Sequence, residues 1–108
     1  MEGEEVLEKL VNEFVEAIEE AKQNPLIIHL DDYKEMIAGN IIDGKLEAAK
    51  YHAELLIGYY VRENPYKPEQ DGIIAKHKEN NPRVYEIFDA SRKMWKIGKI
   101  AEKILKNL

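Results

Sequence analysis

The sequence has 108 residues, no cysteine, and a formal net charge of −5 from 16 basic and 21 acidic residues. This length predicts one helical domain over residues 1–108, and the lack of cysteine excludes disulfides, thiolate metal sites and a cysteine nucleophile. The negative net charge argues mildly against a dedicated nucleic-acid-binding protein.

Residues 4–23 are predicted to form the first helix. Its apolar side chains recur at helical spacing, and its glutamates lie mostly off that stripe. Asn24-Pro25 ends the helix, because the residue before a proline is disfavoured in the α region. The predicted buried stripe comprises Leu7, Leu10, Val11, Phe14, Ala17, Ile18 and Ala21.

Residues 26–30 form a short apolar run whose conformation is ambiguous. No partner strand is evident, so we interpret the run as a buried connector or as the first turn of the next helix. Asp32 and Glu35 match a capping box, which predicts a short helix from Asp32 to about Ala38. Gly39-Asn40 is typical of a left-handed helix end.

Residues 41–63 are predicted to form the central helix, buried by neighbours on several sides. Two apolar rows lie side by side on it, and its small residues allow close approach of other helices. Gly44 offers an alternative start at residue 43, and Asn64-Pro65 ends the helix. The first row is Ile42, Leu46, Ala49, Ala53, Leu56 and Tyr60, and the second is Ile41, Ala48, Leu55 and Tyr59.

Two further helices complete the prediction. Pro68 begins a short helix that ends near Glu79, and Asn81-Pro82 begins a last helix that runs to about residue 107. That last helix is roughly 40 Å long, so its end is expected to project and meet another molecule. Its predicted buried face is Val84 or Tyr85, Ile87, Phe88, Ser91, Met94, Trp95, Gly98, Ala101, Ile104, Leu105 and Leu108. The predicted fold is therefore an all-α bundle of three long helices plus two short helices.

Charge is divided unevenly along the chain. Residues 1–24 contain eight Glu and two Lys, whereas residues 92–108 contain six basic residues and one Glu. A basic stripe on the last helix, spaced by 4, 3, 4 and 3 residues, comprises Arg92, Lys96, Lys99, Lys103 and Lys106. The stripe is either a solvated face, an intramolecular counterpart of the acidic first helix, or a contact for an anionic partner such as nucleic acid. A membrane surface is disfavoured, because the opposite helix face is needed for the core.

No motif for catalysis or metal binding is present. His29, His52 and His77 form no HExxH pattern, and a metal site would need His29 or His52 to meet nearby carboxylates. Ser91, the only serine, has no neighbouring histidine, and the six glycines are isolated. We therefore expect no catalytic, cofactor-binding or metal-binding residues, and no cofactor.

The segment LEAAKYHAELLIGYYV, residues 46–61, resembles the small-residue, aromatic-rich second helix of HEPN-type helical bundles. In that family an Arg followed four to six residues later by a His forms an RNA-cleaving site at a dimer interface. Arg62, Arg83 and Arg92 have no His at that distance. The resemblance therefore implies a dimeric helical bundle and does not extend to nuclease activity.

Sequence alone does not determine the function, but it ranks three hypotheses. We expect a non-catalytic interaction or structural protein that forms a homodimer. The alternatives are a nucleic-acid-binding accessory protein that uses the basic stripe, and a metal-binding or enzymatic bundle. The acidic start, without a signal-peptide pattern or a membrane-length apolar run, predicts a cytoplasmic location. The absence of Thr and the abundance of Ile, Glu and Lys predict a thermophilic source.

Overall fold

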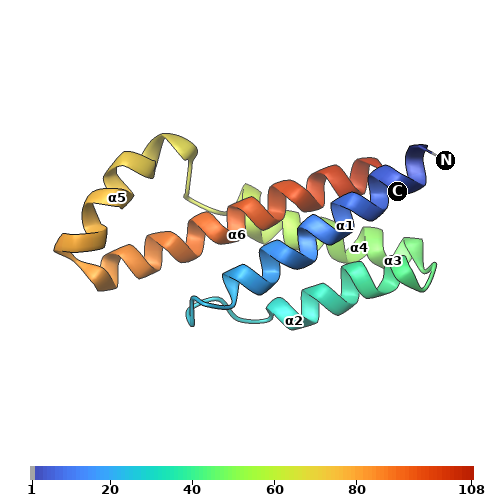
Figure 1. Ribbon diagram of the computed structural model, residues 1–108, viewed down its shortest axis with the longest axis horizontal. Coiled ribbons are helices and arrows are strands. Elements are labelled where there is room, and N and C mark those ends of the chain that lie inside the picture. Colours follow the sequence, from blue (N-terminus) through green and yellow to red (C-terminus); the bar gives the residue numbers. More distant parts are fainter. Residues whose placement is uncertain (1) are drawn as a thin grey trace.

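The computed structural model describes residues 2–108, and its regular structure in that range is entirely helical (Figure 1). The predicted all-α class is thereby confirmed. The elements are α1 (Glu2–Ala21), α2 (Leu30–Tyr33), the π-helical segment η1 (Lys34–Gly39), α3 (Asn40–Ile42), α4 (Leu46–Ile57), the π-helical segment η2 (Gly58–Arg62), the 3₁₀ turn η3 (Pro68–Gln70), α5 (Asp71–Asn80) and α6 (Pro82–Lys106).

Four helical rods form an elongated bundle. α2, η1 and α3 are continuous, and so are α4 and η2. α6 packs against α1 on one side and against α4 and η2 on another, while the rod from α2 to α3 covers α1 and α4. The molecule measures 48 × 23 × 22 Å. α5 extends the long axis, because it packs on the first turns of α6 beyond the end of the bundle (Figure 1).

The core lies where the four rods meet. Each rod contributes fully buried side chains at helical spacing, so burial of apolar surface holds the bundle together. The largest of these side chains are Phe14, Ile18, Ile37, Leu56, Ile97 and Ile104. No helix within residues 2–108 is long and apolar enough to cross a membrane.

The second rod corrects two predictions. Helix α2 begins at Leu30, directly after His29 in a left-handed conformation (φ 64°), so Asp32 lies inside the helix and is not its N-cap. Gly39 and Asn40 have right-handed helical dihedrals, and the rod continues through them. It ends at Gly44, whose φ of 76° suits a residue without a Cβ. Ile37 and Ala38, directly before Gly39, are buried, so packing in η1 rather than local glycine preference keeps the rod helical through Gly39.

The predicted central helix is also corrected. Residues 41–63 are divided at Gly44, so Ile41 and Ile42 belong to the preceding rod. Helix α4 buries only one of its two predicted rows, and the row containing Leu55 and Tyr59 faces away from the core. The helix is therefore amphipathic and not enclosed on several sides.

Helix α6 begins as predicted, with the Asn81 side chain accepting the N–H of Val84 at 3.4 Å. Its predicted buried face is wrong in the first three turns. Asp89 and Ala90 are buried there, whereas Ile87 is exposed, because α5 and the end of α1 cover a different side of this segment than expected. From Gly98 onward the predicted face is confirmed.

Candidate interaction surfaces

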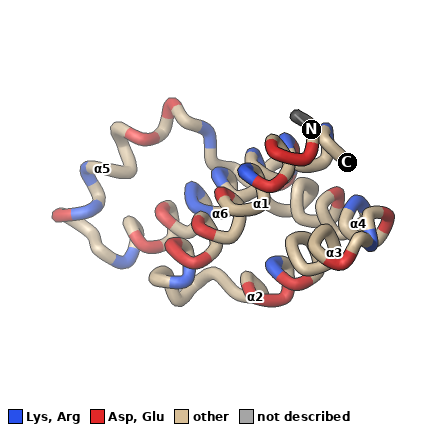
Figure 2. Tube along the Cα trace, turned by 45° about the vertical axis from the view of Figure 1, so that its right-hand side comes forward, with Lys and Arg blue, Asp and Glu red and all other residues tan. Residues whose placement is uncertain are grey.

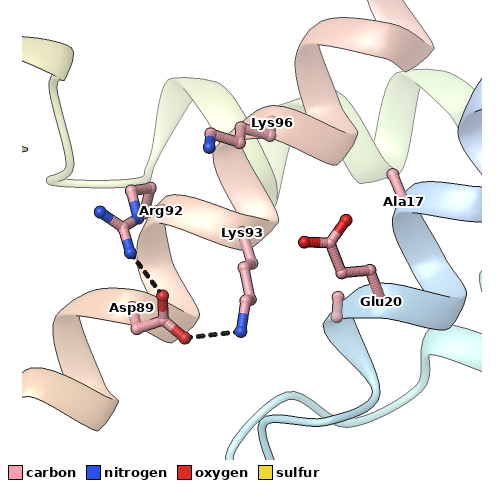
Figure 3. Close-up of a pocket in the computed structure, with 7 residues that line it drawn as sticks. Ala17, Glu20, Asp89, Arg92, Lys93 and Lys96 are labelled. Atoms are coloured by element: carbon pink, nitrogen blue, oxygen red, sulfur yellow. Dashed lines mark hydrogen bonds and ion pairs between the residues drawn. The ribbon is translucent and has the colours of Figure 1, made fainter.

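Arg92, the first residue of the basic stripe, is engaged inside the protein. Its guanidinium donates to Asp89 Oδ1 at 2.7 Å, and Lys93 Nζ lies 2.7 Å from Asp89 Oδ2 (Figure 3). Asn24, in the turn after α1, also donates to Asp89 Oδ2, at 3.4 Å. Burial raises the pKa of Asp89, but hydrogen bonds from these three side chains outweigh burial and hold it below its ordinary value. Arg92 therefore serves mainly to neutralise a buried carboxylate.

The remaining stripe residues differ in their surroundings. Lys99 Nζ lies 2.8 Å from Glu102 and 5.7 Å from the centroid of the Trp95 ring, so its charge is partly satisfied within α6. The other three residues have no carboxylate oxygen of residues 3–108 within 4.0 Å: Lys96, Lys103 and Lys106. The first and last of these lysines are ten residues apart along α6, or about 15 Å.

The acidic first helix lies beside the stripe without direct pairing. Figure 2 shows acidic residues along α1, which packs against α6. Glu20 extends from α1 toward the space occupied by Lys93 and Lys96 (Figure 3), and a cavity of about 160 Å³ separates the two helices there. Among the side chains of residues 3–108, no ion pair shorter than 4.0 Å joins α1 to α6. The free lysines therefore remain available to a partner.

The histidines do not assemble a metal site in the described part of the chain. His29 Nδ1 lies 3.1 Å from Asp32 Oδ2, and His29 and His52 both line a groove between α4 and the rod formed by α2 and η1. His77 instead stacks on Phe88, with ring centroids 5.7 Å apart. Among the side chains of residues 3–108 there is no group of three or more His, Asp or Glu arranged to hold a metal ion.

An exposed aromatic surface lies on α4 and η2. Tyr51, Leu55 and Tyr59 follow each other at steps of four residues, which places them on one side of the helix. The exposed fractions of Tyr51 and Tyr59 are 63% and 56%, and Leu55 is also exposed. On the opposite side of the same helix Ala49, Ala53 and Leu56 are buried, so the tyrosine face is the solvent side of an amphipathic helix. It carries apolar residues at positions where polar ones are usual.

Charged residues border the tyrosine face. Lys50 pairs with Glu47 at 3.3 Å, and Arg62 pairs with Glu54 at 3.6 Å. All four belong to the same continuous helix as the tyrosine face. The border therefore contains two opposite-charge pairs.

A groove adjoins the tyrosine face between α4 and the rod formed by α2 and η1. Its volume is about 270 Å³, and Leu55 lines it as well as belonging to the tyrosine face. Behind the groove, Tyr33 contacts the buried Tyr60 edge-to-face, with centroids 5.5 Å apart. The lining residues of this histidine groove are His29, Asp32, Tyr33, Met36, His52 and Leu55.

Sequence reasoning missed the tyrosine face. It assigned Leu55 and Tyr59 to a buried row and left Tyr51 unassigned. A signal was nevertheless present, because Glu47 and Glu54 lie on the same side of the helix as Tyr51 and mark that side as exposed.

Comparison with protein-family models, with curated proteins and with solved structures gives no match.

Proposed function

We propose that this chain is a non-catalytic interaction protein that forms a homodimer through the tyrosine face. The observation that supports this most directly is the exposure of Tyr51 and Tyr59 beside Leu55. Full burial of one tyrosine removes roughly 150–250 Å² from water, so the two rings offer on the order of 200 Å² of surface to a partner. Tyrosine is enriched at interfaces because it combines a large rigid ring with a hydroxyl group that can hydrogen-bond.

The charged border supports the same proposal. Protein interfaces typically have an apolar, aromatic centre that excludes water and a polar rim that remains wet. The pairs Glu47–Lys50 and Glu54–Arg62 provide such a rim around Tyr51 and its neighbours. Because each pair is satisfied within one chain, the rim can approach another surface without leaving an isolated charge.

A second copy of the chain is the partner that this charge distribution fits. A two-fold dimer places one patch against the same patch of its partner, so a patch of one charge sign repels itself. The exposed side of α1 is an acidic patch, and the free lysines of α6 form a basic patch. Each of these patches would repel the same patch of a second copy. The tyrosine face is apolar and bordered by ion pairs of opposite charge, and it therefore suits two-fold self-association.

The histidine groove gives the surface a complementary shape. Leu55 belongs to both the tyrosine face and the groove, so the two surfaces lie side by side. When two copies meet through this region, a tyrosine that protrudes from one copy can enter the groove of the other. A stable interface buries about 800 Å² on each partner, so the tyrosine face, its rim and the groove would all take part in the dimer contact.

Light scattering coupled to size-exclusion chromatography tests the homodimer. We expect the mass of a dimer at about 100 µM protein, a concentration at which a micromolar dimer is fully formed, and the mass of a monomer for Tyr51→Glu. The matched control is Ile73→Glu, since Ile73 on α5 has a similar exposed fraction of 61% and lies outside the tyrosine face. Circular dichroism verifies that both variants are folded. A wild-type monomer at that concentration would refute the proposal.

Nucleic-acid binding is a second candidate, supported by the three free lysines Lys96, Lys103 and Lys106. A gel-shift titration in about 50 mM salt tests it, because contacts to phosphate weaken steeply as salt rises. Binding that survives the triple change of these lysines to glutamine would exclude the stripe as the contact.

A further inference from the structure

A second apolar groove lies between α1 and α3, away from the residues of the tyrosine face. Its floor is formed by two residues of each helix, and the groove has a volume of about 390 Å³. Two glutamates of α1, one helical turn apart, form its rim. The floor residues of this acidic groove are Leu7, Val11, Ile41 and Ile42, and the rim residues are Glu4 and Glu8.

The floor contains the most exposed large apolar side chain of the described protein. Ile42 has an exposed fraction of 76%, although Val11 beneath it in the same groove is buried. Ile42 is the last residue of α3, directly before the chain turns at Gly44. An isoleucine at this exposed position contributes little to packing within the chain. It is explained if the groove receives an apolar side chain of another molecule.

The rim carries uncompensated negative charge. Within residues 2–108, no basic nitrogen lies within 4.0 Å of Glu4 or Glu8. The ion pairs of α1 lie at its other end, where Glu19 meets Lys22 and Lys34. Negative charge beside an apolar floor attracts a cationic, amphipathic partner and repels anionic ones.

We propose that the acidic groove binds a basic amphipathic helix of a partner protein. Such a helix places apolar side chains at i, i+3 or i+4 onto the floor, while its lysines or arginines face Glu4 and Glu8. The rim disfavours nucleic acid and anionic lipid, since both are negatively charged. It also disfavours a two-fold contact with a second copy, because the two rims would face each other. The proposal is independent of the homodimer, since it uses no residue of the tyrosine face.

Fluorescence anisotropy with two labelled helical peptides tests this proposal. Both peptides have about 18 residues, roughly 27 Å as a helix, with the same leucine face, and they differ only in having lysine or glutamate on the polar face. We expect the lysine peptide to bind at least about tenfold more tightly than the glutamate peptide, with an affinity that falls as salt rises. Equal binding of the two peptides, or no binding of the lysine peptide at about 100 µM protein, would overturn the proposal.

Variants locate the binding. Glu4→Lys/Glu8→Lys should weaken binding of the lysine peptide about tenfold or more, and Ile42→Ser should weaken it about fivefold without affecting the fold, because this side chain is exposed.

The matched control Glu16→Lys/Glu69→Lys makes the same change in net charge at exposed positions outside the groove. An equal loss in this control, or full binding by Ile42→Ser, would show that the peptide is held by general charge and not by the groove. Tyr51→Glu should bind the peptide like the wild type.

Discussion

The side-chain amide of Asn64 donates to the backbone carbonyl of Ser91 at 2.7 Å and so ties the loop after η2 to the middle of α6. The same amide donates to the carbonyl of Tyr60 at 2.9 Å, and its oxygen accepts the backbone N–H of Tyr66 at 3.0 Å. Asn64 is buried, and these bonds use both amide hydrogens and the amide oxygen.

Asn24 makes the matching contacts on the other side of α6. Its oxygen accepts the backbone N–H of Leu26 at 3.0 Å, and its amide nitrogen donates to the carbonyl of Glu86 at 2.9 Å. Both residues precede a proline. Two Asn-Pro turns therefore do more than end helices: they attach the ends of α1 and η2 to the backbone of α6.

Replacing Asn64 with alanine should lower the free energy of unfolding by about 1–3 kcal/mol, because buried polar groups of Tyr60, Tyr66 and Ser91 lose a partner. Urea unfolding followed by circular dichroism measures the change. Asn80→Ala, at an exposed position, is the control and should change stability by less than about 0.5 kcal/mol. Equal stabilities of the two variants would contradict the attachment.

Gly98→Ala should destabilise the protein by about 1–3 kcal/mol through overpacking. A Cβ at position 98 would collide with Val61 Cγ2 and lie 3.1 Å from Tyr60 Cβ, where α6 crosses η2. Gly58→Ala is the matched control, because a Cβ there meets nothing within 4 Å and φ is −55°. Alanine should stabilise that helical position by up to about 1 kcal/mol. Thermal unfolding of both variants gives the comparison, and a neutral Gly98→Ala would refute the close crossing.

The stability difference between the wild type and Asp89→Asn should depend on pH. The pKa of Asp89 is lowered in the folded protein, so its ionised form stabilises the fold above the unfolded-state value of about 3.9. That contribution is lost as pH falls from about 4 through the folded pKa. We therefore expect the variant to be less stable at neutral pH and the difference to shrink in acid. A difference that stays constant from pH 7 to about 2 would contradict this role.

Two tyrosines should titrate late in the folded protein. Burial raises the pKa of Tyr60 to about 12, and burial together with a hydrogen bond to Asp71 raises that of Tyr66 to about 12. A raised tyrosine pKa stabilises the fold below the unfolded value of about 10, and this stability is lost as pH rises from about 10 through 12. Ultraviolet absorbance follows tyrosinate formation. Tyr60→Phe should remove one late-titrating group, and a titration of all six tyrosines near pH 10 in the folded state would disprove the assignment.

The sequence was most informative where one local interaction decides the structure. Asn24-Pro25, Asn64-Pro65 and Asn81-Pro82 marked helix boundaries correctly, because a proline restricts its predecessor whatever the tertiary context. The sequence did not reveal which of two glycines, Gly39 or Gly44, ends the second rod. Both permit a left-handed conformation, and only packing of the side chains around η1 selects Gly44.

The surfaces were less predictable, because exposure depends on which helices pack together. The spacing of the basic stripe placed Arg92 on the same side as Lys96, but it did not reveal that Arg92 neutralises Asp89. That pairing had a local signal, since Asp89 lies three residues before Arg92 and four before Lys93. The tyrosine face and the acidic groove required the relative positions of the four rods, which no local pattern supplies.

The position of α5 outside the bundle has a consequence for how the protein opens. Ile74 is the only fully buried side chain of this helix, and α6 is the only long helix on which it packs. Cooperative units with few buried contacts unfold at a lower cost than the whole molecule. Backbone amides of residues 71–80 should therefore exchange with deuterium well before those of α1 and the second half of α6.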